Sequence, residues 1–79
     1  MIIDSIFQNM ALENMNGIDD IESILIDGQT LQRVQEEYQI MFEQGGAIAV
    51  RELEDYFGAK IELTSEFLPQ GFKIKRLED

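Results

Sequence analysis

The chain contains no cysteine, no histidine and no tryptophan, and Pro69 is its single proline. Without cysteine there is no disulfide framework and no thiolate nucleophile, and without histidine the commonest metal ligand and the usual general base near neutral pH are missing. No apolar run approaches the roughly 20 residues that cross a bilayer, and the first residues lack the basic segment of a signal peptide. These absences argue against an enzyme, a cofactor, a metal site or a membrane protein, and they predict a cytoplasmic location.

Basic residues are also scarce. The chain has 16 acidic and 6 basic residues, which gives a net charge of −10. Residues 1–59 hold twelve acids and two bases, whereas residues 60–79 hold four of each. A field of this sign repels nucleic acid and anionic membranes, so no direct binding to either is expected. The acids either keep the protein soluble or complement a basic partner, and in the second case they can imitate a nucleic-acid backbone.

The length of 79 residues predicts one compact domain that spans residues 1–79. A chain this short buries only about 60% of its unfolded surface, so its core must be thin. No internal repeat, linker or low-complexity tract divides the sequence. Every large apolar side chain is therefore a candidate for the core.

Apolar residues recur at helical spacing in three segments. Ser5 with Gln8 fits a capping box, which predicts a first helix that begins there and stops at Asn16-Gly17, although Asn-Gly is equally a hairpin turn. A second helix is expected to begin at Thr30 and to end before Gly45-Gly46, and a third covers Ala47–Phe57. The positions that carry the spacing are Ile6, Phe7, Met10, Ala11, Met15, Leu31, Val34, Tyr38, Met41, Phe42, Ile48, Val50, Leu53, Tyr56 and Phe57.

Three segments have the pattern of strands. Residues 23–26, "SILI", form a short β-branched run and predict a buried strand. Residues 60–64 and 72–76 alternate apolar with polar side chains, which predicts two half-buried strands with Ile61, Leu63, Phe72 and Ile74 facing the helices. Residues 68–71 between them suit a type I turn, with proline second and glycine fourth, so the two strands are expected to form an antiparallel hairpin.

The segment "TSEFLPQGFK", residues 64–73, places two large apolar residues at the entrance of that turn. If the loop folds back, Phe67 and Leu68 complete the core; otherwise they project as an anchor for a partner. We expect Phe67 to be buried, because a small domain needs all its large side chains. Leu68 is the better anchor, since it precedes Pro69 and is held extended.

The second predicted helix carries the other candidates for partner binding. Ile40 is surrounded on its helix face by charged and polar residues, so it is expected to be exposed. The acids Glu36, Glu37 and Glu43 are expected to serve binding and not folding, because exposed like charges on one helix only repel. The predicted partner-binding residues are therefore Glu36, Glu37, Ile40, Glu43 and Leu68, and no catalytic, cofactor or metal residue is predicted.

The segment "AVRELEDYFGA", Ala49–Ala59, resembles the first helix and turn of a helix-turn-helix, and "GFKIKRLED", Gly71–Asp79, is similar to the wing strand of winged-helix proteins. The resemblance implies a recognition helix after Gly58. Glu54 departs from the motif, which favours a small residue there, and the segment after Gly58 alternates like a strand. A winged-helix-like regulatory protein of this charge is expected to bind protein, and it is the alternative fold.

The sequence thus predicts a small α+β domain with an N-terminal helix, a short strand, two consecutive helices and a C-terminal β-hairpin. Its composition is similar in style to accessory proteins of phages and mobile elements, which implies two non-catalytic roles. The first is a stoichiometric inhibitor or nucleic-acid mimic that covers a basic protein surface, in the host cytoplasm if a phage encodes it. The second is a structural subunit that assembles with itself into a homo-oligomer or with a scaffold.

Overall fold

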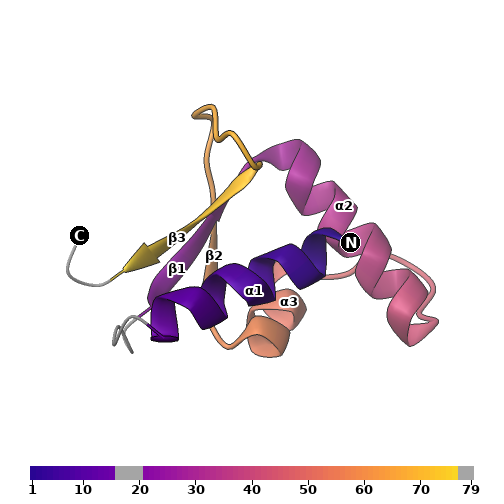
Figure 1. Ribbon diagram of the computed structural model, residues 1–79. Helices are drawn as coiled ribbons and strands as arrows, with labels where there is room; N and C mark the ends of the chain where they lie inside the picture. Colours follow the sequence, from indigo (N-terminus) through magenta and orange to yellow (C-terminus); the bar gives the residue numbers. More distant parts are fainter. Residues whose placement is uncertain (16–20, 77–79) are drawn as a thin grey trace.

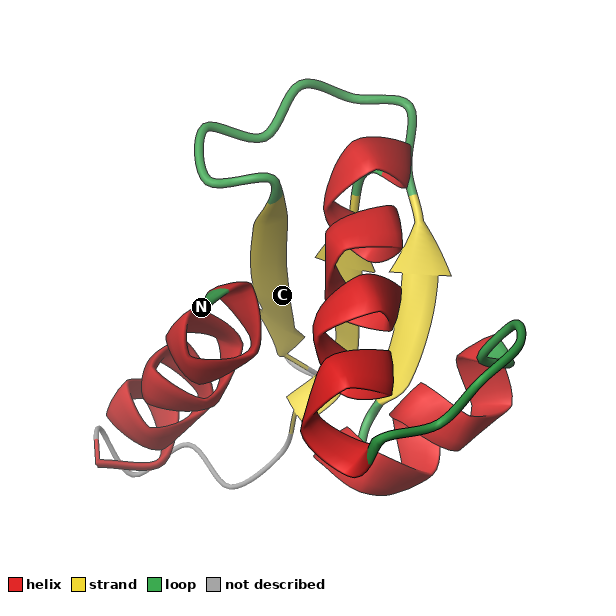
Figure 2. Ribbon diagram, turned by 90° about the vertical axis from the view of Figure 1, so that its right-hand side faces the viewer, coloured by secondary structure: helices red, strands yellow, loops and turns green. Residues whose placement is uncertain are grey.

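The computed structural model describes residues 1–15 and 21–76, which form three helices and a three-stranded mixed sheet (Figure 1). The α+β class and the order of the elements are confirmed. The elements are α1 (Ile2–Met15), β1 (Ile21–Ile26), α2 (Gly28–Phe42), α3 (Val50–Phe57), β2 (Lys60–Leu63) and β3 (Phe72–Arg76). In Figure 2, α2 lies in front of the sheet, with α1 and α3 on either side of it.

The predicted hairpin of residues 60–64 and 72–76 is wrong, because β2 and β3 do not pair with each other. The strand order is β2-β1-β3, with β2 parallel and β3 antiparallel to β1. β1 is the most apolar of the three strands, and Ile24 and Ile26 are almost fully buried. A strand of that kind is most stable in the centre, where both of its edges are paired, whereas charged strands are tolerated at the edges.

The connection between β2 and β3 consequently crosses the end of β1. Thr64 N–H donates to the Ile26 carbonyl at 2.9 Å, and Asp27 N–H donates to the Gly71 carbonyl at 3.0 Å. The predicted turn at residues 68–71 is present, closed by a 2.9 Å bond from Gly71 N–H to the Leu68 carbonyl. The turn therefore belongs to a crossing loop that is fastened at both ends, and not to a tight hairpin.

One face of the sheet is covered by the helices. Ile24 is in register with Ile61 and Ile74, and Ile26 is in register with Phe72. The core comprises Ile3, Ile6, Ile24, Ile26, Val34, Tyr38, Ile48, Leu53, Phe57, Phe72 and Ile74. The expectation that Leu63 faces the helices in the core is wrong: its side chain is 65% exposed, because it lies at the end of an edge strand.

The opposite face of the sheet carries charged side chains. The Lys75 Nζ atom of β3 lies 3.4 Å from the Oε2 atom of Glu22 in β1 and 3.9 Å from the Oε2 atom of Glu62 in β2. Ser23 is fully buried between these neighbours, in register with Lys60 and Lys75. Several of the few basic residues thus gather on the sheet, and the helical side is left with a predominantly acidic surface.

All three predicted helix starts are corrected. α3 begins at Val50 and not at Ala47, because the backbone of Ala49 is extended. α2 begins at Gly28, because the Asp27 carboxylate, and not the Thr30 hydroxyl, is the N-cap and accepts the Thr30 N–H at 2.8 Å. α1 begins at Ile2 and not at Ser5, whose hydroxyl bonds back to the Met1 carbonyl at 3.4 Å. A cap from another helix, described below, makes this earlier start possible.

The winged-helix alternative is also wrong, because a strand and not a recognition helix follows Gly58. Gly58 does end α3 in the left-handed conformation, with φ of 75°. Glu54, the residue that departs from the helix-turn-helix pattern, has a structural reason: its carboxylate accepts the Ile61 N–H at 2.8 Å. It thereby fastens α3 to β2.

Candidate functional site

Three of the predicted partner-binding residues lie in the second half of α2 and at its C-cap. Glu36 and Ile40 are separated by four positions, which places them above one another on the helix, and Glu43 is the C-cap residue three positions after Ile40. All three are exposed, and the Ile40 side chain is 74% exposed. We call this set the α2 ridge. Ile40 is an exposed apolar side chain on a small domain that has few apolar residues for its core. Its exposure is either incidental or part of a contact with a partner.

The last turn of α2 is exposed on more than the ridge. Met41 and Phe42 follow Ile40 directly and are 42% and 46% exposed. Helical spacing predicts both of them in the core. They are left out because α2 continues past the sheet, as the lower right of Figure 1 shows, so that no strand covers its end.

Glu43 ends α2 in an unfavourable conformation. Its φ of 54° makes it the only non-glycine residue of the described chain with a positive φ, and its N–H bonds to the carbonyls of Gln39 and Ile40. This cap position normally belongs to glycine, since the left-handed region costs other residues about 1–2 kcal/mol. A negative charge at a helix C-terminus is also repelled by the helix dipole. Glu43 therefore lowers the stability of the folded chain.

Two glutamines hold the segment after Glu43 against α2. Gln35 donates from its amide nitrogen to the Ile48 carbonyl at 2.9 Å, and Gln39 donates in the same way to the Gly46 carbonyl. Ile48 is buried and so fixes the far end of the segment in the core. The left-handed Glu43 is thus held by its surroundings, which is the situation in which a costly conformation persists.

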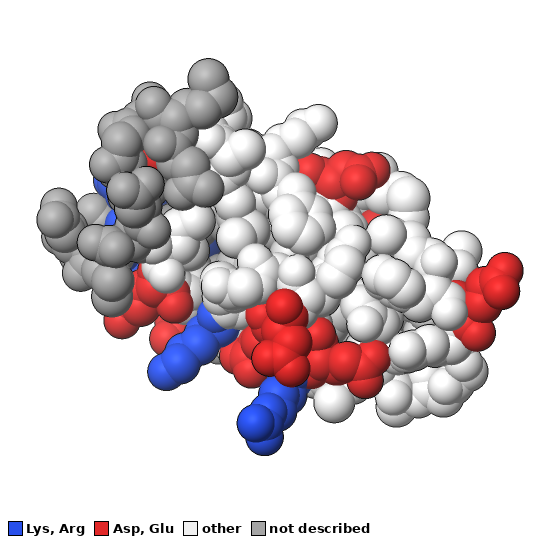
Figure 3. All heavy atoms as spheres, turned by 90° about the horizontal axis from the view of Figure 1, so that it is seen from below, with Lys and Arg blue, Asp and Glu red and all other residues white. Residues whose placement is uncertain are grey.

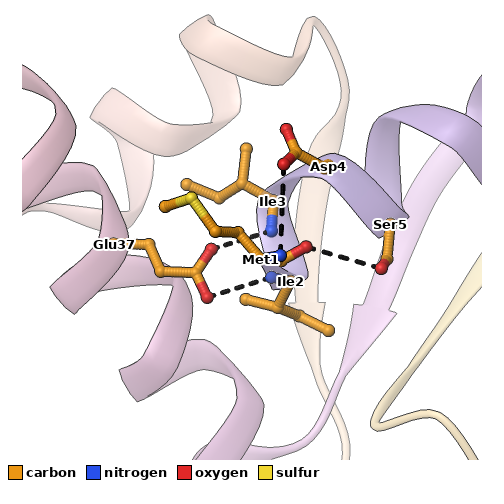
Figure 4. Close-up of polar contacts among 6 residues, drawn as sticks. All are labelled: Met1, Ile2, Ile3, Asp4, Ser5 and Glu37. Atoms are coloured by element: carbon orange, nitrogen blue, oxygen red, sulfur yellow. Dashed lines mark hydrogen bonds and ion pairs between the residues drawn. The ribbon is translucent and has the colours of Figure 1, made fainter.

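Glu37 does not belong to the ridge. It points at α1, where its two carboxylate oxygens accept the Ile2 and Ile3 N–H groups at 2.9 and 3.0 Å (Figure 4). These are orphan donors of the first turn, and a carboxylate there also complements the positive end of the helix dipole. The expectation that Glu37 is a free surface acid without a part in folding is wrong.

Leu68 lies at the other end of the molecule, in the crossing loop. It is half-buried, whereas its neighbour Phe67 is 88% exposed. The expectation that Phe67 completes the core is therefore wrong, and Phe67 is the more exposed residue of the pair. The reason is the topology: the loop passes beyond the end of β1 and leaves the Phe67 side chain outside the core.

An aromatic cluster that no local sequence pattern indicates lies where the three helices meet. Tyr56 of α3 packs edge-to-face with Phe7 of α1 at 5.4 Å and with Phe42 of α2 at 5.5 Å between ring centroids. Tyr38 and Phe57 complete the cluster from inside. Helical spacing predicts all five rings in the core, but only Tyr38 and Phe57 are buried.

The polar groups of this cluster influence one another. Burial raises the pKa of the Tyr38 phenol above its usual 10.0, and the negative charge of the nearby Glu52 carboxylate raises it further. Glu52 lies in the first turn of α3, and its Oε2 atom is buried without a hydrogen-bond donor. A negative charge is thus held close to the Tyr38 hydroxyl.

Comparison with protein-family models, with curated proteins and with solved structures finds no match for this chain. Within residues 1–15 and 21–76, no group of three or more acidic side chains is placed to hold a metal ion. Among the same residues, no helix has the length and apolar character to cross a membrane. Function is therefore inferred from the surface alone.

Proposed function

We propose that the protein is a small acidic binding module whose α2 ridge contacts a basic surface of a larger protein. The observation that carries the proposal is Ile40, an exposed apolar side chain with Glu36 one turn before it and the C-cap residue Glu43 three positions after it. An apolar anchor surrounded by charge of one sign is the arrangement of an interface hot spot with its rim. The acids provide specificity and speed of association, and Ile40 provides apolar contact.

Glu43 supports the same proposal from its energetics. A glycine in its place would relieve the left-handed strain and remove a charge that opposes the helix dipole. Residues that lower stability in this way are concentrated at functional sites. The role we propose is that of a stoichiometric inhibitor, which covers a basic surface and imitates the charge of a nucleic-acid backbone.

The substitution Glu43→Gly separates binding from stability. We expect it to stabilise the fold by about 0.5–1 kcal/mol, or about 2–8 °C in Tm, because it removes strain. We expect it also to weaken the partner complex. The parent protein is used as bait in an extract of the source cell, the captured protein is purified, and its Kd is measured for the parent, Glu43→Gly and Ile40→Ala.

Glu66→Gln is the matched control, since it removes an equally exposed acid from the crossing loop at the other end of the molecule. Binding that becomes weaker with added salt and with both ridge variants, but not with the control, supports the proposal. If Glu43→Gly and Ile40→Ala bind as tightly as the parent, the ridge is not the binding surface and the proposal is wrong.

A self-assembling structural subunit is the second candidate, and the exposed Phe67 favours it. This side chain and Leu63 are both largely bare at one end of the molecule, where a second copy could cover them. Light scattering across a range of concentrations distinguishes the two roles. A stable oligomer that Phe67→Ala dissociates supports assembly, whereas a monomer at every concentration excludes self-assembly and leaves the binding module.

A further inference from the structure

Three partly exposed aromatic rings from three different helices form one continuous surface. Phe7, Phe42 and Tyr56 are in contact through Tyr56, at centroid distances of 5.4 and 5.5 Å. Phe7 is 37% and Phe42 46% exposed. We call these three residues the aromatic patch. Edge-to-face contacts fix the rings relative to one another, so the rings lose little conformational freedom when a partner binds to them.

Each of the three rings has an exposed acid close to it in the sequence. Asp4 lies three positions before Phe7, Glu43 directly follows Phe42, and Asp55 directly precedes Tyr56. Figure 3 shows the side of the molecule that faces down in Figure 1, where acidic side chains lie at several edges of a broad neutral area and basic side chains project along one edge. The acidic edges predict that the partner of this surface carries positive charge.

A cation above Tyr56 and Phe42 would interact with the faces of the two rings. Lysine and arginine side chains provide such a cation, and neutral side chains do not.

We propose that the aromatic patch is the docking site for one basic amphipathic α-helix of a partner protein. Apolar side chains on one face of that helix pack on Phe7, Phe42 and Tyr56, and its lysine or arginine residues meet Asp4, Glu43 and Asp55. The inference rests on the proposed function, because it assumes a basic partner, and it adds to the α2 ridge a second contact surface and the shape of what binds there. A helix of about 16 residues is about 24 Å long and has four turns with which to contact the three rings and the acids.

A second copy of this chain does not suit the patch. Two such surfaces face to face would bring their acidic borders together, and each copy carries a net charge of −10. Like charges that face each other across an interface cost binding energy. The expected complex is therefore heteromeric, with one helix to one molecule.

The absence of tryptophan gives this surface its own optical signal. Tyr38 and Tyr56 are the two tyrosines of the chain, and both belong to the aromatic cluster. A synthetic helix of about 16 residues that contains leucine, alanine, lysine and arginine but no aromatic residue serves as the probe. Its binding is followed by the tyrosine fluorescence of the full chain and by calorimetry. The control peptide has the same composition in an order that mixes apolar and basic residues around the helix.

The variants come in matched pairs. Phe42→Ala and Phe67→Ala each remove one exposed phenylalanine, the first from the patch and the second from the crossing loop. Asp55→Asn and Glu66→Gln each neutralise one exposed acid at the same two places. We expect the amphipathic peptide to bind with 1:1 stoichiometry and to change the tyrosine fluorescence. Phe42→Ala should weaken it by about tenfold or more and Asp55→Asn severalfold, and both loop variants should leave the Kd unchanged.

The outcomes separate this inference from the proposed function. If the amphipathic and control peptides bind equally, or if the patch and loop variants weaken binding equally, the attraction is one of net charge only and the docking site is wrong. If Ile40→Ala weakens peptide binding while Phe42→Ala does not, the ridge binds the basic partner; the proposed function then stands and the patch is wrong. Association of the chain with itself through Phe42 would also overturn the inference.

Discussion

A single carboxylate decides where α1 begins. Glu37 accepts the N–H groups of Ile2 and Ile3 from a position 35 and 34 residues away in sequence. We expect Glu37→Ala to destabilise the protein by about 1–2 kcal/mol, because two donors of the first turn lose their acceptor and the positive end of the helix dipole loses its counter-charge. Urea unfolding followed by circular dichroism measures the change.

The neighbouring residue supplies the control for Glu37. Glu36→Ala removes an exposed acid from the same helix and should change stability by no more than about 0.5 kcal/mol. Equal effects of the two substitutions would show that charge alone matters at these positions, and the capping role of Glu37 would be wrong.

The Tyr38 phenol should make the fold less stable in alkaline solution. Its pKa in the folded protein lies above the usual 10.0, chiefly because it is buried and also because Glu52 is negative. The neutral phenol is therefore favoured by folding, so its contribution is complete below pH 10.0 and is lost as the pH rises through the higher folded-state pKa. In a Tyr56→Phe background, Glu52→Gln should lower the Tyr38 pKa, as measured by phenolate absorbance. An unchanged pKa would mean that the Glu52 charge does not reach the phenol.

At the scale of elements, the crossing loop is fixed at its base and open at its tip. Gly71 has a φ of 86°, and a Cβ atom there would overlap Thr30 Oγ1 and lie 3.1 Å from Thr30 Cβ. Gly71→Ala should therefore cost about 2 kcal/mol or more, from left-handed strain and overpacking together. Phe67→Ala should stay within about 0.5 kcal/mol of the parent, since its side chain is bare.

Thermal unfolding of these two variants and of Gly28→Ala checks the loop. A Cβ atom added to Gly28 would meet no other atom within 4 Å, so the alanine there should be tolerated. If Phe67→Ala lowered Tm as much as Gly71→Ala, the phenylalanine would be packed in solution, and the loop would close over the sheet.

Periodicity in the sequence predicted the elements well and their neighbours poorly. The helix of residues 47–57 and the strand patterns at residues 60–64 and 72–76 depend on local spacing, which a short window contains. The position of a strand in the sheet depends on how apolar that strand is relative to the other strands. A short window around one strand does not contain this comparison. Phe42, Leu63 and Phe67 were predicted in the core because each fits an apolar position, but a thin core has room for only some of them.

The candidate site was foreseen to a similar extent. Glu36 and Ile40 share a face because their spacing requires it, and the sequence shows that spacing directly. The separate role of Glu37 follows from the packing of α1 against α2, which no local pattern contains. The positive φ of Glu43 has no signal in the sequence, because the glycine that normally takes this cap position comes only at Gly45, two positions later.

At the scale of the whole molecule, the net charge of −10 opposes folding. The ion pairs of Lys75 and Arg76 are partly exposed and contribute little, so repulsion among the acids should dominate. Raising the salt concentration from about 0.01 M to about 0.15 M shortens the screening length from about 30 Å to about 8 Å. We therefore expect Tm to rise by several degrees over this range. Reversing two exposed acids, Glu36→Lys and Asp55→Lys, changes the net charge by +2 each, from −10 to −6; it should raise Tm at low salt and reduce the salt dependence. A Tm that falls with salt would mean that the ion pairs outweigh the repulsion, and the acidic surface would then stabilise the fold in its own right.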